Sequence, residues 1–281
     1  MKRTHYRTVF LSDIHLGFKD CKAEYLLSFL KSIECDTLYL LGDIVDMWSM
    51  KKRFMWPSSH YEVLKAIFKM AKKGTRIIYI PGNHDEPMRD YIEHMIGPVE
   101  VHEDFIHITA QDKKLLLFHG DILDSQIRFG KYTKIVGDLA YDLLLFVNRW
   151  GNFFRRRFGF SYFSLACYLK NSVKNAREAI EIFEIAAAHE AKRRNLDGVV
   201  CGHIHQAEIR VIDGILYCND GDWIESCTAM VEDETGHLEI IHWSDLQKSV
   251  KKVSIKNQSE NNGVEIVAPA DEAPLAARNY A

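Results

Sequence analysis

Residues 9–15 read Val-Phe-Leu-Ser-Asp-Ile-His, an apolar run that stops at a polar Asp-x-His triplet. Residues 37–41, Thr-Leu-Tyr-Leu-Leu, repeat this pattern and stop at Gly42-Asp43. Short apolar runs of this kind are typical of strands buried inside a sheet. Between them, residues 24–33 place apolar side chains at helical spacing. The sequence therefore predicts a strand-helix-strand unit at the start of the chain.

The same order of elements continues along the chain. Residues 61–72 have helical spacing, Gly74 ends this helix, and residues 76–80 form a third apolar run. Further strands are expected at residues 105–109, 114–118 and 198–201, followed by hairpins at residues 208–217 and 229–243. This order predicts an α/β fold of two packed sheets with helices on both outer faces. Polar residues follow the carboxyl ends of the strands, where open α/β sheets bind their ligands.

Five short polar motifs follow these strand ends, and together they contain donors for two metal ions. One such motif is common by chance, so it is the complete ordered set that favours a metal site. Oxygen and imidazole donors without thiolate suit Mn, Fe, Co or Zn better than Mg or Ca. We predict two divalent ions as cofactors, with Mn preferred and Fe or Zn as alternatives. The predicted ligands are Asp13, His15, Asp43 and His205 on one ion, and Asp43, Asn83, His119 and His203 on the other.

Two reasons support this assignment of ligands. Aspartate and histidine two residues apart on a strand point to the same side, which applies to Asp13 with His15 and repeats at His203 with His205. Asp43, at the end of the neighbouring strand, could bridge both ions with its two oxygens. A carboxylate shared by two metals is a common arrangement for attack on a phosphate ester, with water activated by the metals as the nucleophile. No serine or cysteine nucleophile is then required.

His84 follows the predicted ligand Asn83 and is the predicted catalytic side chain. It is close enough in sequence to contact the phosphoryl oxygens or the leaving oxygen, and Asp85 could hold its ring. We therefore assign His84 to transition-state stabilisation or leaving-group protonation, with Asp85 as its orienter. The alternatives are that His84 is a further metal ligand or only a turn residue.

The composition describes a globular protein with a full core. The chain has 281 residues, of which 47% are hydrophobic, and this fits one catalytic domain with an elaboration. The net charge of −3 does not indicate nucleic acid as a partner. An N-terminal apolar signal and a membrane-spanning run of about 18 residues are both missing from the sequence, so we expect a cytoplasmic location. Six scattered cysteines without a C-x-x-C pair suit reduced thiols better than disulfides.

The stretch at residues 125–195 departs from the alternation of strands and helices. Ten aromatic residues fall within residues 141–168, and residues 125–177 contain ten Lys or Arg against two Asp. We predict a helical lid insertion here, a core formed by residues 1–124 and 196–247, and a disordered tail at residues 248–281. The predicted substrate-binding residues of the lid are Trp150, Phe154, Arg155, Arg156, Arg157, Asn171 and Ser172.

Two interpretations of the insertion remain open. It could be a helical hairpin that packs on the core, with its arginines on a solvated face. Alternatively, a lid with an apolar inner surface and a basic rim would suit acyl chains and phosphates, or an anionic membrane surface. Nucleic acid binding is disfavoured, because it uses exposed aromatic rings and these aromatics have the spacing of a helix core.

The motif set resembles that of the calcineurin-like metallophosphoesterases over residues 8–243. The matching motifs are Asp13-x-His15, Gly42-Asp43-x-x-Asp46, Gly82-Asn83-His84-Asp85-Glu86, His119-Gly120-Asp121 and Gly202-His203-x-His205. The resemblance implies a four-layer αββα sandwich that hydrolyses a phosphomonoester, a phosphodiester or a pyrophosphate. The predicted metal ligands agree with the pattern of this family.

The position of the insertion, between His119-Gly120-Asp121 and Gly202-His203-Ile204-His205, is similar to that in the UDP-2,3-diacylglucosamine diphosphatases of lipid A synthesis. Asn171-Ser172 and Gly221-Asp222-Trp223 also resemble that group. The resemblance implies a nucleotide-linked lipid substrate, cleaved to UMP and an acylated sugar phosphate. Separately, the basic and aromatic composition of the insertion favours peripheral contact with the anionic inner face of the cell membrane. One departure is His84, where the best-defined branch has arginine. The alternatives are a phosphodiesterase, nuclease or phosphatase of other specificity, or an inactive metal-binding scaffold.

Overall fold

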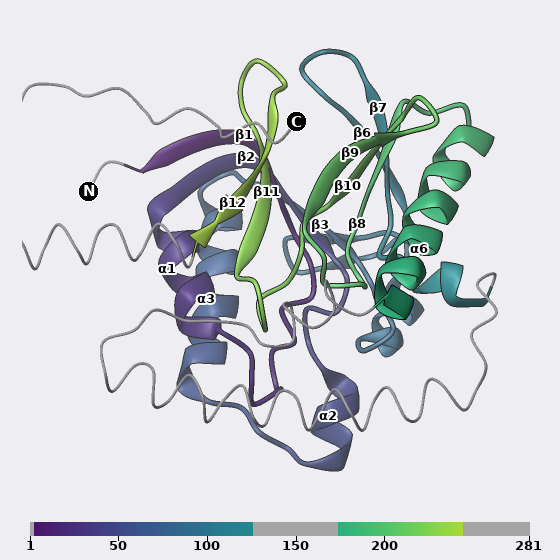
Figure 1. Cartoon of the computed structure of the whole chain (residues 1–281). Coiled ribbons are helices and arrows are strands. Elements are labelled where there is room, and N and C mark those ends of the chain that lie inside the picture. The colour runs from purple at the N-terminus through teal and green to yellow at the C-terminus, as the bar shows by residue number, and fades with distance from the viewer. Residues whose placement is uncertain (1–2, 126–173, 244–281) are drawn as a thin grey trace, which may run out of the picture. The chain divides into compact units, whose positions relative to one another are not determined.

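The computed structural model describes residues 3–125 and 174–243, and these form two sheets (Figure 1). The strand order of the first sheet is β12-β11-β1-β2-β3-β5-β4, and that of the second is β6-β7-β8-β10-β9. The first contains β1 (Thr4–Leu11), β2 (Ile33–Leu41), β3 (Arg76–Ile80), β4 (Met95–Ile96), β5 (Val99–Val101), β11 (Thr228–Glu232) and β12 (Leu238–His242). The second contains β6 (Phe105–Ile108), β7 (Lys114–Leu117), β8 (Gly198–Cys201), β9 (Glu208–Ile212) and β10 (Ile215–Asn219).

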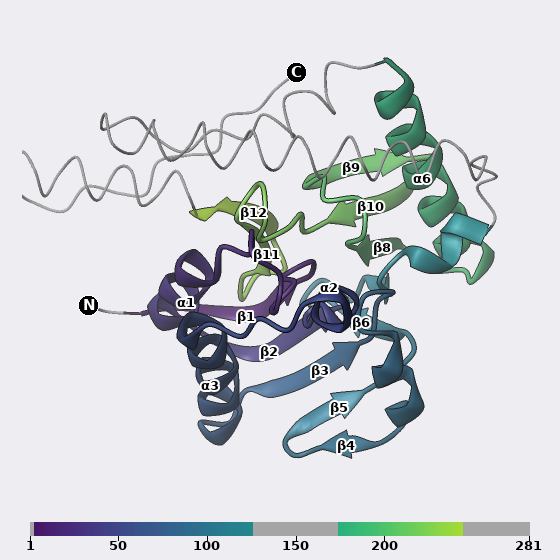
Figure 2. The ribbon, with the colours of Figure 1, turned by 90° about the horizontal axis from the view of Figure 1, so that it is seen from below.

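Helices cover the outer face of each sheet, so the molecule has four layers (Figures 1 and 2). The helices α1 (Ala23–Ser32) and α3 (Ser58–Lys72) pack on the seven-stranded sheet, and α6 (Lys174–Arg193) packs on the five-stranded one. A third apolar cluster, which includes Phe10 and Leu117, fills the space between the sheets. The predicted αββα sandwich is therefore confirmed.

Strand alternation explains how one strand serves two interfaces. Successive side chains of a strand point to opposite faces of its sheet. In β1, Val9 and Leu11 pack beneath the helices, whereas Phe10 between them faces the other sheet and stacks on Tyr39 with ring centroids 5.2 Å apart. All three of these β1 residues are fully buried, which is why the run reads as continuously apolar.

The structure also contains short elements that the sequence analysis did not predict. These are α2 (Met47–Lys52), the 3-10 helices η1 (Glu86–Tyr91) and η2 (Asp121–Ser125), and the strands β4 and β5. Moreover, α6 lies within the predicted insertion but forms the outer layer of the sandwich, with Phe183, Ala187 and Ala191 buried on the sheet. That part of the prediction is corrected: residues 174–193 belong to the core. The rest of the predicted lid and the predicted tail lie outside the described residues.

Among the helices in the described part of the chain, none combines the length and apolar composition of a membrane span. The five cysteines in that part, Cys21, Cys35, Cys201, Cys218 and Cys227, are free thiols.

Candidate metal centre

The loops that carry the predicted ligands meet at one edge of the sandwich. The strands β1, β2 and β3 are parallel neighbours, as are β7 and β8, so within each sheet the carboxyl ends of these strands lie together. Backbone hydrogen bonds join the loops to one another. The Asp13 amide donates to the Gly42 carbonyl at 3.1 Å, and the Gly202 amide donates to the His119 carbonyl at 3.0 Å. Residues far apart in the sequence are thus held side by side.

The ligand loops have an uncommon backbone conformation. Five predicted ligands have positive φ angles, between 49° and 71°: Asp13, His15, Asp43, His203 and His205. This conformation costs a non-glycine residue about 1 kcal/mol or more and is concentrated at functional sites. The structure therefore corrects our argument from strand alternation. Asp13 and His15 converge through left-handed turns after β1 has ended, not along an extended strand.

Asp43 lies between two groups of donors. Its Oδ2 is 3.7 Å from His15 Nε2 and 3.5 Å from His119 Nε2. His119 Nε2 is also 3.3 Å from the Asn83 side-chain oxygen. The other oxygen, Asp43 Oδ1, accepts a hydrogen bond of 2.8 Å from the His84 amide. Asp43 Oδ2 is thus within 3.7 Å of a histidine of each group, and the hydrogen bond to Oδ1 holds the carboxylate in this orientation.

Asp13 is the centre of the first group. Its Oδ1 is 3.1 Å from His205 Nε2 and 3.9 Å from His15 Nε2. Its Oδ2 accepts a hydrogen bond of 2.8 Å from the His203 amide. Asp13 is fully buried, so its charge cannot be offset by water.

His203 joins the second group through its ring. The ring centroid lies 5.2 Å from that of His119, and Nε2 is 3.0 Å from Asp124 Oδ1. The structure thus brings all seven predicted ligands to one place, six by contacts between donor atoms and His203 by its ring contact. Asp124, three residues after the end of the His119-Gly120-Asp121 motif, was not identified from the sequence.

Outer hydrogen bonds determine which ring nitrogen faces the centre. His15 Nδ1 is 3.2 Å from Asp46 Oδ2, and His119 Nδ1 donates to the Leu41 carbonyl at 2.8 Å. Both rings therefore present Nε2 inward, which is how metal-binding histidines are held in known sites. Asp46 was part of a matched motif, Gly42-Asp43-x-x-Asp46, and that motif was the signal that could have assigned it this role.

The predicted partnership of His84 with Asp85 is wrong. His84 Nδ1 is 3.0 Å from Asp46 Oδ1, whereas Asp85 accepts hydrogen bonds from the Gly82 and Ile44 amides and from the Tyr79 hydroxyl. Adjacent residues point in different directions here, and Asp85 turns into the protein, where burial raises its pKa. Asp85 thus holds the loops after β2 and β3 together, and Asp46 is the orienter of His84.

Asp13 is itself oriented from behind by Ser12. The Ser12 hydroxyl lies 2.5 Å from Asp13 Oδ2 and 2.7 Å from Asp220 Oδ1. Burial raises the pKa of Asp220 well above its ordinary value, with the nearby Asp13 charge acting in the same direction. Ser12 and Asp220 carried no role in the sequence analysis, because the contact joins positions at opposite ends of the chain.

The donor set fits metal ions. Asp13 Oδ1 and His15 Nε2 are buried and form no hydrogen bond with any described residue, although both face the centre. Burial alone would lower the pKa of His15, but the neighbouring carboxylates of Asp13, Asp46 and Asp43 raise it to about 10. The same concentration of negative charge would attract divalent cations. Donor atoms within 4.8 Å of one another occur in the sets Asp13, His15, His205 and Asp13, Asp43, His119.

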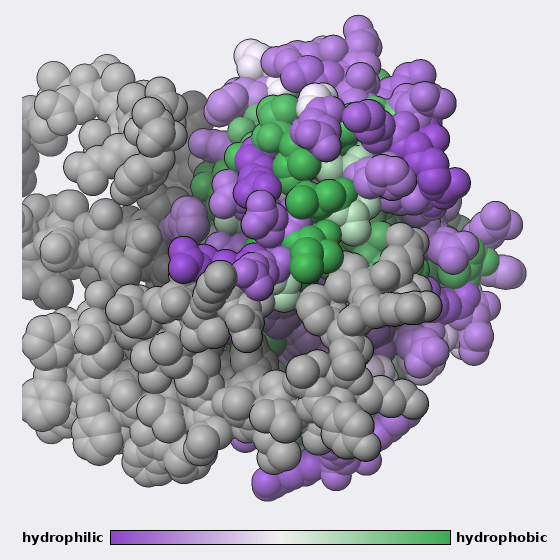
Figure 3. Space-filling view, turned by 45° about the vertical axis from the view of Figure 1, so that its right-hand side comes forward, coloured by the Kyte–Doolittle hydropathy of each residue, from purple (hydrophilic) through white to green (hydrophobic). Residues whose placement is uncertain are grey.

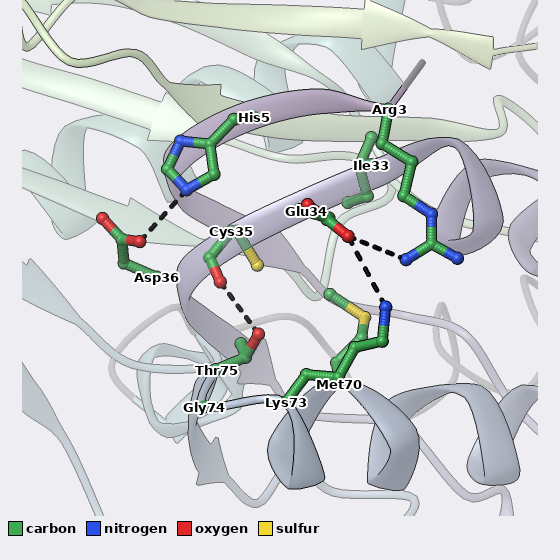
Figure 4. A pocket seen from close by; sticks show the side chains of 10 residues that line it. All are labelled: Arg3, His5, Ile33, Glu34, Cys35, Asp36, Met70, Lys73, Gly74 and Thr75. Carbon is green, nitrogen blue, oxygen red and sulfur yellow. Dashed lines mark hydrogen bonds and ion pairs between the residues drawn. The ribbon is translucent and has the colours of Figure 1, made fainter. Parts of the chain in front are cut away.

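A pocket of about 510 Å³ lies at the other end of the first sheet (Figure 4). It is lined by residues at the starts of β1, β2 and β3, and Glu34 lies there 3.0 Å from Arg3 and 3.5 Å from Lys73. The five motifs follow strand ends instead, so this pocket is separate from the metal centre. Its charged side chains are already paired with one another.

The face on the side of α6 has a patch of apolar side chains among polar ones (Figure 3). On α6 itself, Ile182 and Ile185 are 48% and 47% exposed. The chain that leads into α6 is the predicted insertion. Its predicted substrate-binding residues lie outside the described residues: Trp150, Phe154, Arg155, Arg156, Arg157, Asn171 and Ser172.

Residues 6–207 match the calcineurin-like phosphoesterase family. Since the match covers most of the chain, the chain belongs to this family and is a metal-dependent phosphoesterase. The family resemblance predicted from the five motifs is thereby confirmed.

Two curated relatives with the same name match most of this chain. The chain is 26% identical over 213 residues to UDP-2,3-diacylglucosamine hydrolase of Blochmanniella pennsylvanica, covering 73% of this chain and 81% of the relative. It is 25% identical over 255 residues to the hydrolase of the same name from Haemophilus influenzae, covering 83% and 97%. Among solved structures, an archaeal phosphodiesterase matches with a TM-score of 0.38 and 14% identity, covering 83% of this chain and 98% of the other.

Proposed function

We propose that this phosphoesterase hydrolyses the pyrophosphate bond of UDP-2,3-diacylglucosamine to UMP and 2,3-diacylglucosamine 1-phosphate. The observation that carries the proposal is the alignment with the Haemophilus influenzae hydrolase, which spans 97% of that relative and 83% of this chain. The donor groups around Asp13 and Asp43 supply the chemistry that such a bond requires. A nucleotide-linked lipid is then the substrate class.

The residues that would hold the two metal ions are those predicted from the sequence. Asp13, His15 and His205 would hold one ion, Asn83, His119 and His203 the other, and Asp43 would be shared. When bound, such ions activate water and offset the charge that develops on the phosphoryl oxygens. We take Mn as the preferred metal, with Fe or Zn as alternatives, because imidazole and carboxylate donors suit all three.

His84 would act on the substrate from the rim of the centre. Its side chain is 26% exposed, and Asp46 occupies Nδ1, so Nε2 remains available for a substrate oxygen. We assign His84 to stabilising the phosphoryl oxygens or to protonating the leaving oxygen. The paired carboxylate of Asp46 would stabilise the protonated ring that such a transfer needs.

The insertion would supply the contacts to the lipid. Trp150 and Phe154 would contact acyl chains, Arg155, Arg156 and Arg157 the phosphates, and Asn171-Ser172 further polar groups. We infer a cytoplasmic enzyme that touches the anionic inner face of the cell membrane through this basic, aromatic stretch. Nucleic acid is not the expected substrate.

The direct test is incubation of the Mn-loaded protein with UDP-2,3-diacylglucosamine, followed by phosphorus NMR. Appearance of UMP together with the acylated sugar phosphate is the expected result. Cleavage of simple phosphodiesters without any release of UMP would contradict the proposed substrate and favour a phosphodiesterase or nuclease. A protein inactive with every divalent ion would favour a metal-binding scaffold.

The lipid contacts have a test of their own. Replacing Trp150 and Phe154 together by alanine should lower the rate with the acylated substrate far more than the rate with bis(p-nitrophenyl) phosphate. Equal losses with both substrates would mean that the two aromatics stabilise the protein and do not contact acyl chains.

A further inference from the structure

Trp48 is a large exposed side chain beside the catalytic histidine. It lies on α2, it is 44% exposed, and its ring centroid is 4.7 Å from that of His84, with 36° between the planes. On its other side, His84 meets the ring of His15 at 4.6 Å in an edge contact. His84 is thus flanked by two rings, of which the Trp48 indole remains 44% exposed to solvent.

The position of Trp48 is set by the contacts that also set His84. Asp46 caps α2 by accepting a hydrogen bond of 2.7 Å from the Ser49 amide, and the same carboxylate binds the His84 ring. The Met47 amide donates to the His84 carbonyl at 3.0 Å. A six-residue helix has little stability of its own, so these contacts keep Trp48 in place. The Trp48 ring is therefore held in a fixed position at the edge of the metal centre.

Cationic residues follow Trp48 at helical spacing, since Lys51 and Lys52 lie three and four positions further along α2 and so share its face. Lys51, Lys52 and Arg53 are exposed, and they make no ion pair with any residue in the described part of the chain. Free cations beside an exposed indole favour an anionic group that carries a planar ring. They disfavour a bare acyl chain, which would have to approach strongly hydrated ammonium groups.

We propose that Trp48 is a specificity-determining residue whose exposed face stacks on the nucleobase of the substrate. This inference rests on the proposed function, since it places the uridine side of the pyrophosphate over α2. Stacking of an aromatic side chain on a base strengthens binding by about 5- to 150-fold. The phosphate would bind at the metal centre beside Asp43, and the base would bind on Trp48, five residues further along the chain.

The test uses two ligands that differ at one carbon of the ribose, which carries uracil in UMP and a hydroxyl group in ribose 5-phosphate. Calorimetric titration of the full-length, Mn-loaded protein with UMP and with ribose 5-phosphate gives the ratio of their dissociation constants. In the wild type, UMP should bind about 5- to 150-fold more tightly. Trp48→Ala should bring the ratio close to one by weakening UMP alone, and Trp48→Phe should restore part of the preference.

The matched control is Phe68→Ala, which removes another aromatic that is 40% exposed, on α3. It should leave the ratio unchanged. If Trp48 only shields His84, its loss would weaken both ligands equally, and that result would overturn the inference, as would a wild type that binds UMP no more tightly than ribose 5-phosphate. Release of UMP from the lipid substrate is measured separately, so the proposed function can stand when this inference fails.

Discussion

Replacing Asp46 by asparagine should weaken metal binding, because one carboxylate supports two histidines. Oδ1 accepts hydrogen bonds from the Ser49 amide at 2.7 Å and from His84 Nδ1 at 3.0 Å, while Oδ2 contacts the Ser49 hydroxyl at 2.9 Å and His15 Nδ1 at 3.2 Å. Burial would raise the pKa of Asp46, but the hydrogen bonds of both histidines hold it well below its usual range. The wild-type side chain is therefore a carboxylate with two accepting oxygens.

Asparagine keeps one accepting oxygen. The orientation that preserves the helix cap and the His84 bond turns the amide NH2 toward His15, so the metal-facing histidine loses its support. One lost charge-assisted hydrogen bond costs about 1.5–3 kcal/mol. This agrees with the roughly 10- to 100-fold loss in metal affinity or activity that follows removal of such outer partners.

The assay is a Mn titration of metal-free protein, together with turnover of bis(p-nitrophenyl) phosphate at saturating Mn. Asp46→Asn should shift the Mn dissociation constant upward by about 10- to 100-fold. Ser49→Ala is the control, since it removes a hydroxyl from the same carboxylate and leaves both histidine contacts. The reasoning is refuted if Asp46→Asn binds Mn as the wild type does, or if Ser49→Ala weakens binding just as much.

Three further predictions concern the centre and the core. His84→Ala should lose most turnover but keep its metal by elemental analysis, whereas Asp43→Asn should lose metal as well, and equal metal loss would remove the distinction. Gly82→Ala should also lose metal, because a Cβ would lie 2.8 Å from the Asp43 amide nitrogen; a variant with full metal content would contradict this. Glu232→Gln should lower the free energy of unfolding by about 3 kcal/mol, since the buried carboxylate binds Arg7 at 2.9 Å and His107 at 2.8 Å. Burial would raise the pKa of Glu232, but its hydrogen bonds lower it below the ordinary value. The contribution of Glu232 to the free energy of unfolding is therefore present above about pH 4.3 and is lost in acid. Denaturant titrations at two pH values measure this, with the exposed Glu234→Gln as the neutral control.

The long elements could be predicted from the sequence because their patterns are local. The strands β3 and β8 begin and end where their apolar runs do, and α1 differs from its predicted helix by one residue at each end. By contrast, α2 has no buried residue, and β4 and β5 have two and three residues, so no periodicity marks them. Short elements of this kind form because neighbouring loops hold them.

The residues of the metal centre also fall into a group that local sequence patterns predict and a group that they do not. Its seven predicted ligands are marked by residue type and by their place after strands. Adjacency in the sequence pointed to Asp85 as the partner of His84, but the actual partner, Asp46, lies 38 positions before His84 in the chain. Contacts such as that of Ser12 with Asp220 depend on how distant loops pack, and the sequence pattern contains no such information.

The glycines of the motifs explain why the motifs occur as a set. At Gly82, a Cβ would overlap Asp43 Oδ1, and at Gly202 it would overlap both Asp13 Oδ2 and the Ser12 hydroxyl. Each glycine therefore makes room for a predicted ligand that belongs to another motif. A single Gly-Asn or Gly-His pair in a sequence is explained by an ordinary turn. When the glycine lies against a carboxylate from a different strand end, the loops can close around shared metal ions only if all of them keep their spacing.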